Sequence, residues 1–132
     1  MTAPTIAPII AIDTSTLIAY LAGEKGPDVE TLDVALARNR AHLPPVVVTE
    51  TLSAPGSAGR VADLILALPV LAVIEGYWER AGLLRRRVLA RGHKAPLADA
   101  LIAQSCLDHD VALVTRDGDF KNFARHGGLR LA

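Results

Sequence analysis

Residues 9–16 read IIAIDTST, four consecutive aliphatic residues that run directly into an aspartate and three hydroxyl residues. An aliphatic run of this kind is typical of a strand buried on both faces, as in a parallel sheet covered by helices. Asp13 then stands where the strand ends, at the carboxyl edge of the sheet. In open α/β folds this edge is where ligands and metal ions bind. The run therefore predicts both a parallel sheet and a functional carboxylate at its rim.

The same arrangement recurs further along the chain. Residues 46–49 (VVVT) lead into Glu50, and residues 111–114 (VALV) lead within three residues to Asp117. A fourth acid, Asp99, opens a segment with helical spacing just upstream of the last of these strands. Because the carboxyl ends of parallel strands meet at one edge of a sheet, we expect all four acids on the same rim.

Periodicity and turn residues predict the other elements. Apolar residues at helical spacing predict helices over 17–21, 27–36, 61–68, 77–88 and 96–109, and a short helix that opens at Glu50. Further apolar runs predict strands at 70–74 and, more briefly, at 129–131. Small residues predict a loop over 53–59, and the Asp-Gly-Asp sequence at 117–119 predicts a turn. Strands that alternate with helices indicate an α/β fold, with a parallel sheet and helices on both faces, in a single domain of residues 1–132.

Composition excludes several classes of protein. The chain has 132 residues, of which 51% are hydrophobic, and its apolar runs are far too short for a transmembrane helix. Residues 1–8 lack the basic flank and cleavage site of a secretory signal. The single cysteine, Cys106, excludes an internal disulfide and fits a reducing cytoplasm. We therefore expect a cytoplasmic protein with no membrane contact.

Charge is balanced in total but unevenly distributed. Fourteen Lys and Arg residues face fourteen Asp and Glu residues, which argues against a general polyanion binder. Residues 80–94, however, carry a run of basic side chains interrupted by no acid: Arg80, Arg85, Arg86, Arg87, Arg91 and Lys94. A negative pocket beside a positive rim is what a metal-dependent enzyme acting on phosphodiesters needs.

The acid cluster predicts a metal site. Several carboxylates on one rim repel one another unless a cation neutralises them, and all-oxygen ligands favour Mg²⁺ or Mn²⁺. We expect Asp13 as the central ligand, with Asp99 and Asp117 completing the metal site and Glu50 orienting or deprotonating the attacking water. The reaction class is then metal-assisted phosphodiester hydrolysis. Three neighbouring hydroxyls are expected to support these groups by hydrogen bonding: Thr14, Ser15 and Thr115.

Each of these residues also has a simpler explanation. An acid after a strand often caps the following helix, where backbone N–H groups favour negative charge. The whole chain could be a non-catalytic RNA- or protein-binding domain, or a phosphotransfer domain with Asp13 as the phosphate acceptor. The second would want paired acids at this point, and the sequence supplies Thr14 and Ser15 instead. Cys106 lies in an apolar helical pattern, typical of an inert buried thiol.

Four segments resemble the motifs of one known family. The sequences AIDTSTLIAYL, PPVVVTETLSAP, HKAPLADALIAQSC and VALVTRDGDF occur in this order. They resemble the four motifs of PIN-domain proteins, and with the chain length they resemble the VapC toxins of bacterial type II toxin–antitoxin systems. The resemblance implies a three-layer α/β/α sandwich around a mostly parallel five-stranded sheet. It also implies an Mg²⁺- or Mn²⁺-dependent endoribonuclease that a VapB-like antitoxin inhibits, and a homodimer that can enter a larger toxin–antitoxin assembly.

The family's acidic quartet falls on residues already singled out: Asp13, Glu50, Asp99 and Asp117. Asp119 lies where some relatives also have an acid, so it is a further candidate. For the RNA substrate, Arg116 borders the expected pocket, although a salt bridge to Asp117 or Asp119 is its simpler role. The cluster Arg85, Arg86 and Arg87 could contact phosphates or could be a solvated helix face. Which RNA is cut does not follow from one sequence.

Overall fold

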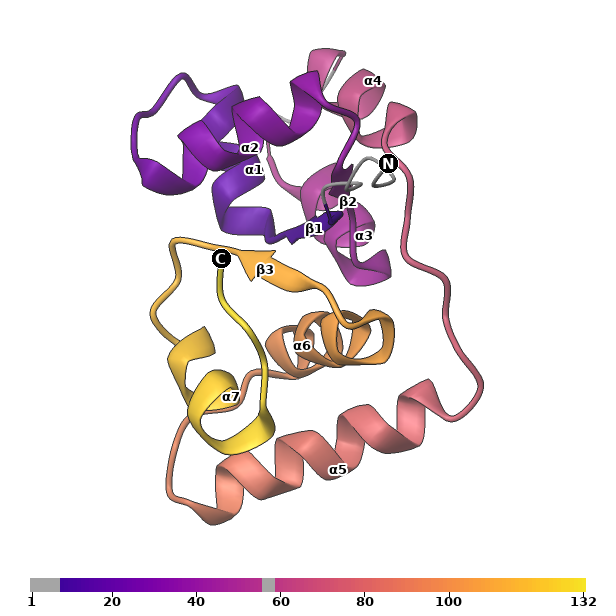
Figure 1. Ribbon diagram of the computed structural model, residues 1–132, viewed down its shortest axis with the longest axis vertical. Helices are drawn as coiled ribbons and strands as arrows, with labels where there is room; N and C mark the ends of the chain where they lie inside the picture. Colours follow the sequence, from indigo (N-terminus) through magenta and orange to yellow (C-terminus); the bar gives the residue numbers. More distant parts are fainter. Residues whose placement is uncertain (1–7, 56–58) are drawn as a thin grey trace, which may run out of the picture.

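Three short parallel strands form the centre of the computed structural model, which describes residues 8–55 and 59–132. The elements in chain order are β1 (Ile10–Ile12), α1 (Thr14–Leu21), α2 (Pro27–Ala37), β2 (Ala41–His42), α3 (Pro45–Ser53), α4 (Arg60–Ala67), α5 (Tyr77–Ala90), α6 (Leu97–His109), β3 (Ala112–Val114) and α7 (Phe120–Gly127). Figure 1 shows the sheet at mid-height, with α1, α2 and α4 above it and α5, α6 and α7 below.

The sheet has the order β2-β1-β3, with β1 in the middle. Ile10 pairs with Ala41 of β2, and Ile12 pairs with Val114 of β3. Two further segments extend the parallel arrangement by one bridge each. Val70 pairs with Leu43 beyond β2, and Leu131 pairs with Leu113 beyond β3. Five segments therefore lie in parallel, three as strands and two as single bridges. Four of them were expected from the sequence; β2 was not, because the expected strand there was 46–49.

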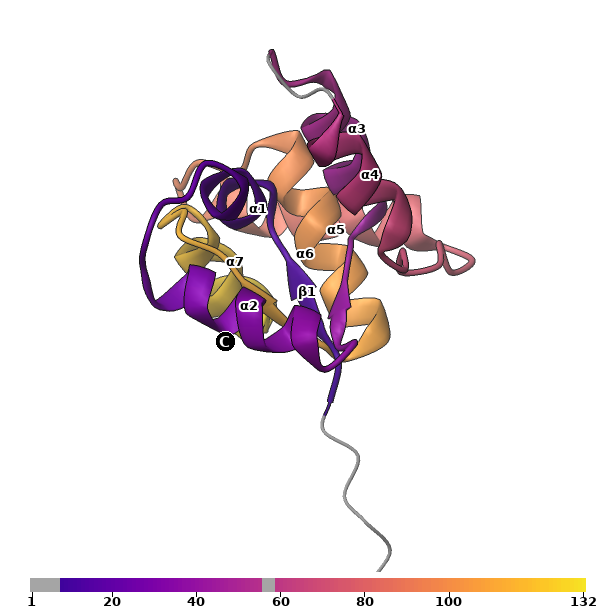
Figure 2. The same ribbon diagram turned by 90° about the horizontal axis from the view of Figure 1, so that it is seen from above.

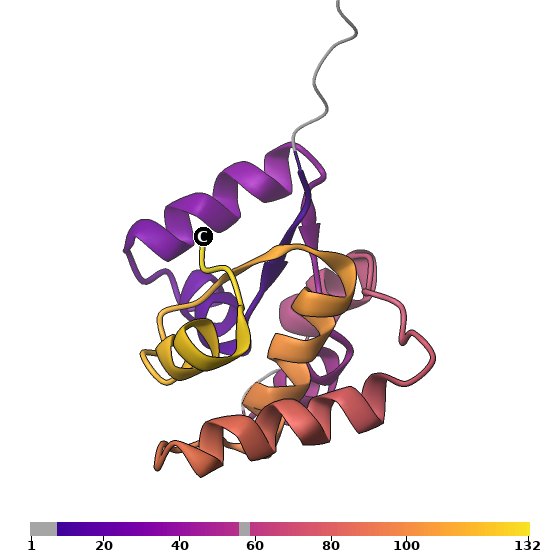
Figure 3. The same cartoon turned by 60° about the horizontal axis from the view of Figure 1, so that its bottom comes forward.

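Helices cover both faces of this sheet. Figure 3 shows α2 on one side and α6 on the other, with α5 as an outer layer against α6. Figure 2 shows α3 and α4 grouped together, away from α2 and α7. The interior is mainly aliphatic, with Tyr77 of α5 and two phenylalanines of α7 as buried aromatic residues; among its fully buried side chains are Ile12, Leu17, Leu32, Leu43, Ile102, Leu113, Phe120 and Phe123. Burial of this apolar surface is the main driving force for the fold.

The predicted strand at 46–49 is wrong, because these residues form the first half of α3. Pro44 and Pro45 explain the start, since proline is favoured at the first positions of a helix, where its missing N–H costs nothing. Val47 and Thr51, four residues apart, are both fully buried, so a helical face packs into the core. Packing therefore overrides the β-propensity of three consecutive valines. The second strand, Ala41–His42, precedes the prolines.

The predicted strands at 70–74 and 129–131 are each reduced to a single bridge, and helix α7 was not predicted. In the 70–74 run, Leu71 is buried but Val73 and Ile74 are 49% and 41% exposed, so the run does not continue as a strand. Segment 129–131 contributes only the Leu131 bridge. Helix α7 follows the turn at Gly118 and Asp119.

The remaining helices and strands agree with the sequence predictions. Pro27 begins α2, and Gly92, with a φ of +81°, follows the end of α5 in the left-handed conformation that glycine favours. The predicted loop at 53–59 is described only in part, since residues 56–58 lie outside the described residues. Within the described ranges, no helix combines the length and apolar character that crossing a bilayer requires.

Candidate metal centre

The carboxyl edge of the sheet brings Asp13 and Thr115 together. Ile12 and Val114 are paired in neighbouring strands, so the residues that follow them leave the sheet side by side. The Asp13 N–H donates to Val114 O at 2.9 Å. The Oγ1 of Thr115 and the Oγ of Ser15 both donate to Oδ2 of Asp13, at 2.7 and 2.6 Å. Two of the three hydroxyls predicted to support the site therefore hold Asp13 directly.

Asp13 is a buried carboxylate, with 4% of its surface exposed. Burial raises its pKa above the ordinary value, and the hydrogen bonds from Ser15 and Thr115 act in the opposite direction. Thr115 also accepts a hydrogen bond from the backbone N–H of Asp117 at 3.0 Å. One hydroxyl thus couples the end of β1 to the loop that carries the next acid.

The loop after β3 supplies two carboxylates. The N–H of Asp119 donates to Oδ1 of Asp117 at 2.9 Å, which fixes the turn between them. Asp119 is the residue from which α7 begins. Asp99 comes from a different element, the first turn of α6. One carboxylate oxygen from each of Asp99, Asp117 and Asp119 lies within 4.8 Å of the others.

Asp99 shows how strongly these charges interact. Burial and, after it, the negative charges of Asp117, Asp13, Asp119 and Glu50 together raise its pKa to about 7. The other three predicted site acids, and Asp119, therefore lie close enough to affect the pKa of Asp99. Asp13 is not among the three whose oxygens cluster, and Asp119 is. The sequence signal for Asp119 was its place two residues after Asp117, in a turn.

These acids fit a hard divalent cation. Mg²⁺ binds oxygen at about 2.1 Å, so opposite ligands lie about 4 Å apart, close to the spacing of the three carboxylates. A cation also offsets the repulsion that raises the pKa of Asp99. Asp99, Asp117 and Asp119 are the residues that could hold such an ion, with Asp13 beside them.

Glu50 reaches the rim from the interior of α3 rather than from a strand end. Its Oε1 accepts a hydrogen bond of 2.9 Å from the Oγ1 of Thr14, the first residue of α1. The third predicted hydroxyl therefore orients Glu50 and not Asp13. Although the predicted strand before Glu50 was wrong, the acid still faces the site, because α3 and α1 pack together.

Arg116 has partners different from those expected. Its guanidinium donates to both carboxylate oxygens of Asp28, at 2.9 and 3.2 Å, and lies 3.6 Å from the Glu24 carboxylate. The Oγ1 of Thr16 donates to the same Asp28. The Arg116 hydrogen bond is the main cause that lowers the pKa of Asp28. Arg116 thus ties the loop that bears Asp117 to the start of α2, and its pairing with Asp28 was not visible in the sequence.

The other predicted substrate arginines lie on α5. The Nε of Arg85 donates to Ala95 O at 2.7 Å, which braces the connection from α5 to α6. Arg86 and Arg87 are exposed on the outer helix. Cys106 is buried, and burial raises the pKa of its thiol to about 12, as expected of an inert cysteine.

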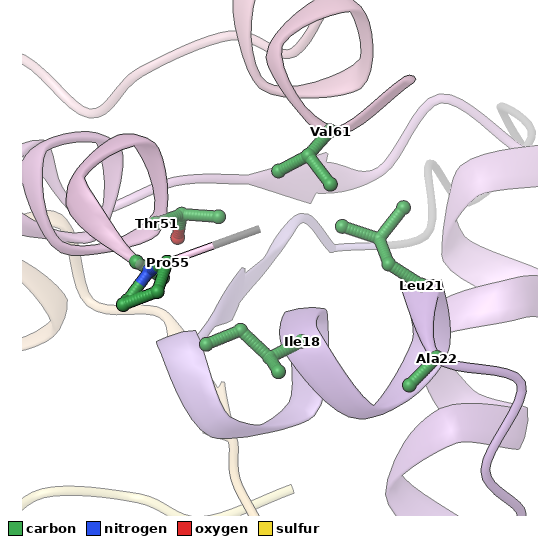
Figure 4. Close-up of a pocket in the computed structure, with 7 residues that line it drawn as sticks. Ile18, Leu21, Ala22, Thr51, Pro55 and Val61 are labelled. Atoms are coloured by element: carbon green, nitrogen blue, oxygen red, sulfur yellow. The ribbon is translucent and has the colours of Figure 1, made fainter. Parts of the chain in front are cut away.

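An apolar pocket of about 210 Å³ lies between α1, α3 and α4. Figure 4 shows Ile18 and Leu21 of α1 facing Val61 of α4, with Thr51 and Pro55 on the side of α3. No acid lines this pocket, so it is separate in chemistry from the metal centre. Both α1 and α3 nevertheless border the two sites, since Thr14 and Glu50 belong to these helices.

Comparison with known proteins identifies the fold. A family model described as PIN domain matches residues 10–126. Among solved structures, VapBC2 from Rickettsia felis bound to a DNA fragment from their promoter matches with a TM-score of 0.74 and 19% identity, over 94% of this chain and 97% of that one. DNA-bound VapBC from Salmonella typhimurium matches with a TM-score of 0.64 and 18% identity, over 96% and 98%. A search among curated proteins finds no match. The matches confirm the predicted three-layer α/β/α fold class.

Proposed function

The chain belongs to the PIN domain family, and from this premise we propose that it is a metal-dependent endoribonuclease that hydrolyses RNA phosphodiester bonds at the acidic centre. The observation that carries the proposal is the convergence of Asp99, Asp117 and Asp119, one oxygen of each within 4.8 Å of the others. These residues come from α6 and from the loop after β3, so the cluster is built by the fold and not by one local turn.

Each residue has a definable part in this reaction. Asp99, Asp117 and Asp119 would hold Mg²⁺ or Mn²⁺, with Asp13 as a further ligand or as the charge that keeps the site negative. A divalent ion bound there supplies a more acidic water and stabilises charge on the phosphoryl oxygens. Glu50, held by Thr14, would orient the attacking water or accept its proton. Ser15 and Thr115 fix the Asp13 carboxylate.

We further propose that the protein is a VapC-like toxin with a VapB-like antitoxin as its partner, acting in the cytoplasm. The support is the likeness in fold to the two VapBC structures. The apolar pocket between α1, α3 and α4 would accept an apolar side chain of such an antitoxin, close to the metal centre (Figure 4). A homodimer and a larger toxin–antitoxin assembly belong to the same proposal.

The phosphotransfer alternative has less support from the site. A phosphate acceptor must be reachable, but Asp13 is 4% exposed and its Oδ2 already accepts two hydroxyl hydrogen bonds. The non-catalytic alternative does not explain why the fold holds several mutually repelling carboxylates close together.

Metal removal tests the proposed function. We expect purified protein to cut total cellular RNA at discrete positions when Mg²⁺ or Mn²⁺ is supplied, and to leave it intact with a chelator. Sequencing of the newly formed RNA ends gives the readout, and restoring the ion after chelation should restore the same cuts. RNA that stays intact under every metal condition contradicts the nuclease and favours a binding domain.

A further inference from the structure

A cluster of basic side chains lies beside the acidic centre, where the end of α5 and the residues after it meet the last turn of α7. We call it the basic patch; its residues are Arg91, His93, Lys94, Arg125 and His126. Figure 1 shows these two helix ends next to each other, with the connection from α5 to α6 passing beside α7. The patch is thus assembled from segments about 30 residues apart in the chain.

A stacked pair of histidines forms the middle of the patch. The rings of His93 and His126 have centroids 5.0 Å apart and planes at 20°. Burial lowers the pKa of His126, and the neighbouring His93, Arg91 and Arg125 lower it further. These groups therefore repel one another, and the Nε2 of His126 has no hydrogen-bond partner among the residues that the structure describes. A bound anion would offset this repulsion.

The helix dipole explains only part of the cluster. Arg125 and His126 lie in the last turn of α7, where positive charge is stabilising. Arg91 is the C-cap residue of α5, where the dipole of that helix also favours positive charge. Neither dipole removes the repulsion between the two groups of basic side chains, which meet where His93 and His126 stack.

Lys94 joins the patch to the metal centre. Its Nζ lies 3.9 Å from Oδ2 of Asp119, and its side chain is 80% exposed. Within residues 8–55 and 59–132, this is the one ion pair that any patch residue makes with an acid. A polyanion whose scissile phosphate reached Asp119 would therefore meet positive charge along the next part of its backbone.

The arginines expected from the sequence to bind substrate are less suitable. Arg116 is held by Asp28 and Glu24. Arg85 is held by Ala95 O. Both guanidiniums already have fixed partners, whereas Arg91 and Arg125 are exposed and make no ion pair within the described ranges.

We infer that the basic patch binds backbone phosphates of the RNA strand beside the cleaved bond, and so sets the direction in which the strand crosses the metal centre. The inference rests on the proposed function for the nature of the polyanion. Phosphate contacts of this type position a nucleic acid without reading its sequence. A chain with no net charge can bind RNA in this way only where its positive charge is concentrated.

A binding measurement tests the patch separately from catalysis. The protein carries Asp99→Asn to prevent cleavage, and the probe is a fluorescein-labelled single-stranded RNA of mixed sequence, about 20 nucleotides long. The double variant Arg91→Gln with Arg125→Gln is compared with Arg38→Gln with Arg60→Gln. The second pair removes the same charge from exposed positions at the end of α2 and the start of α4, outside the patch, so total charge is matched. Fluorescence anisotropy is recorded over a range of salt concentrations.

We expect the patch variant to bind the RNA about tenfold more weakly and to reduce the slope of log affinity against log salt by roughly 1 to 2, while the control changes affinity less than about twofold. Equal losses in both variants, or no loss in either, overturn the inference. A patch variant that binds RNA normally but loses a co-purifying protein also overturns it, since the patch is then a protein contact. If the patch binds RNA but the parent protein does not cut RNA under any metal condition, the inference about the patch holds and the proposed nuclease function is contradicted.

Discussion

Asp99→Asn is expected to lower metal-dependent RNA cleavage by at least about 1,000-fold, a loss of about 4 kcal/mol of transition-state stabilisation. Asp99 is the only one of the three clustered acids that comes from α6, so its removal opens one side of the cluster. An asparagine of the same shape keeps the packing but removes the negative charge that a divalent ion needs. Initial cleavage rates on one RNA, with saturating Mn²⁺, give the measurement.

The same variant should make the metal-free protein more stable. The carboxyl of Asp99 has a pKa of about 7 in the folded protein, against about 3.9 in an unfolded chain. Between these values the folded state holds a proton that the unfolded state lacks, so the free energy of unfolding falls as pH rises from about 4 to about 7, and the penalty is complete above that. At about pH 8 we expect Asp99→Asn to gain about 1 to 2 kcal/mol, less than the full shift implies because the side chain is partly exposed.

Asp63→Asn is the matched control, because Asp63 is exposed in the first turn of α4, away from the metal centre. It should leave both cleavage and the pH dependence of unfolding unchanged. If Asp99→Asn cuts RNA at the rate of the parent, Asp99 is not needed for metal-dependent cleavage. If the variant unfolds more easily than the parent at about pH 8 without metal, the negative charge of Asp99 does not destabilise the metal-free fold.

Phe120→Ala is expected to destabilise the protein by about 3 to 5 kcal/mol. Phe120 is fully buried, begins α7 directly after Asp119, and packs near Phe123 with ring centroids 6.1 Å apart. Its removal leaves a cavity beneath the helix that fixes the loop with Asp117 and Asp119. A loss of this size is a large share of the stability of a typical domain. Urea unfolding followed by circular dichroism measures it.

Leu66→Ala supplies the comparison for this variant. Leu66 is a large apolar residue on α4 but is 74% exposed, so its truncation removes little buried surface. We expect a change within about 0.5 kcal/mol. A Phe120→Ala protein as stable as Leu66→Ala would mean that α7 is not anchored through its phenylalanines, and the placement of Asp117 and Asp119 would then need another cause.

Local signals in the sequence were sufficient for much of the sheet and for part of the site. An aliphatic run that ends on an acid identified β1 with Asp13, and a similar run identified β3 with the loop to Asp117. These predictions held because parallel strands in register deliver their next residues to one edge, whatever the helices do. The placement of Asp99 likewise followed from its position in the first turn of α6.

The incorrect predictions concern residues whose structure depends on contacts with distant parts of the chain. Three valines at 46–48 have strand propensity, but Pro45 and the buried face of Val47 and Thr51 select a helix. Glu50 was placed at the rim for the wrong reason, since it comes from within α3. The bidentate pair of Arg116 with Asp28 joins residues 88 positions apart, and no local pattern indicates such a contact. For α7, the spacing of Phe120 and Phe123 and the following glycines were the available signal.

The central claim, that acids from separate elements converge to bind a divalent ion, is tested most directly by crystals of the protein soaked in Mn²⁺ and measured at a wavelength where manganese scatters anomalously. We predict an anomalous peak between the carboxylates of Asp99, Asp117 and Asp119, beside Asp13, and no peak there in Asp99→Asn crystals. Asp99, Asp117 and Asp119 side chains that turn away from one another in the parent, with no manganese between them, would contradict it.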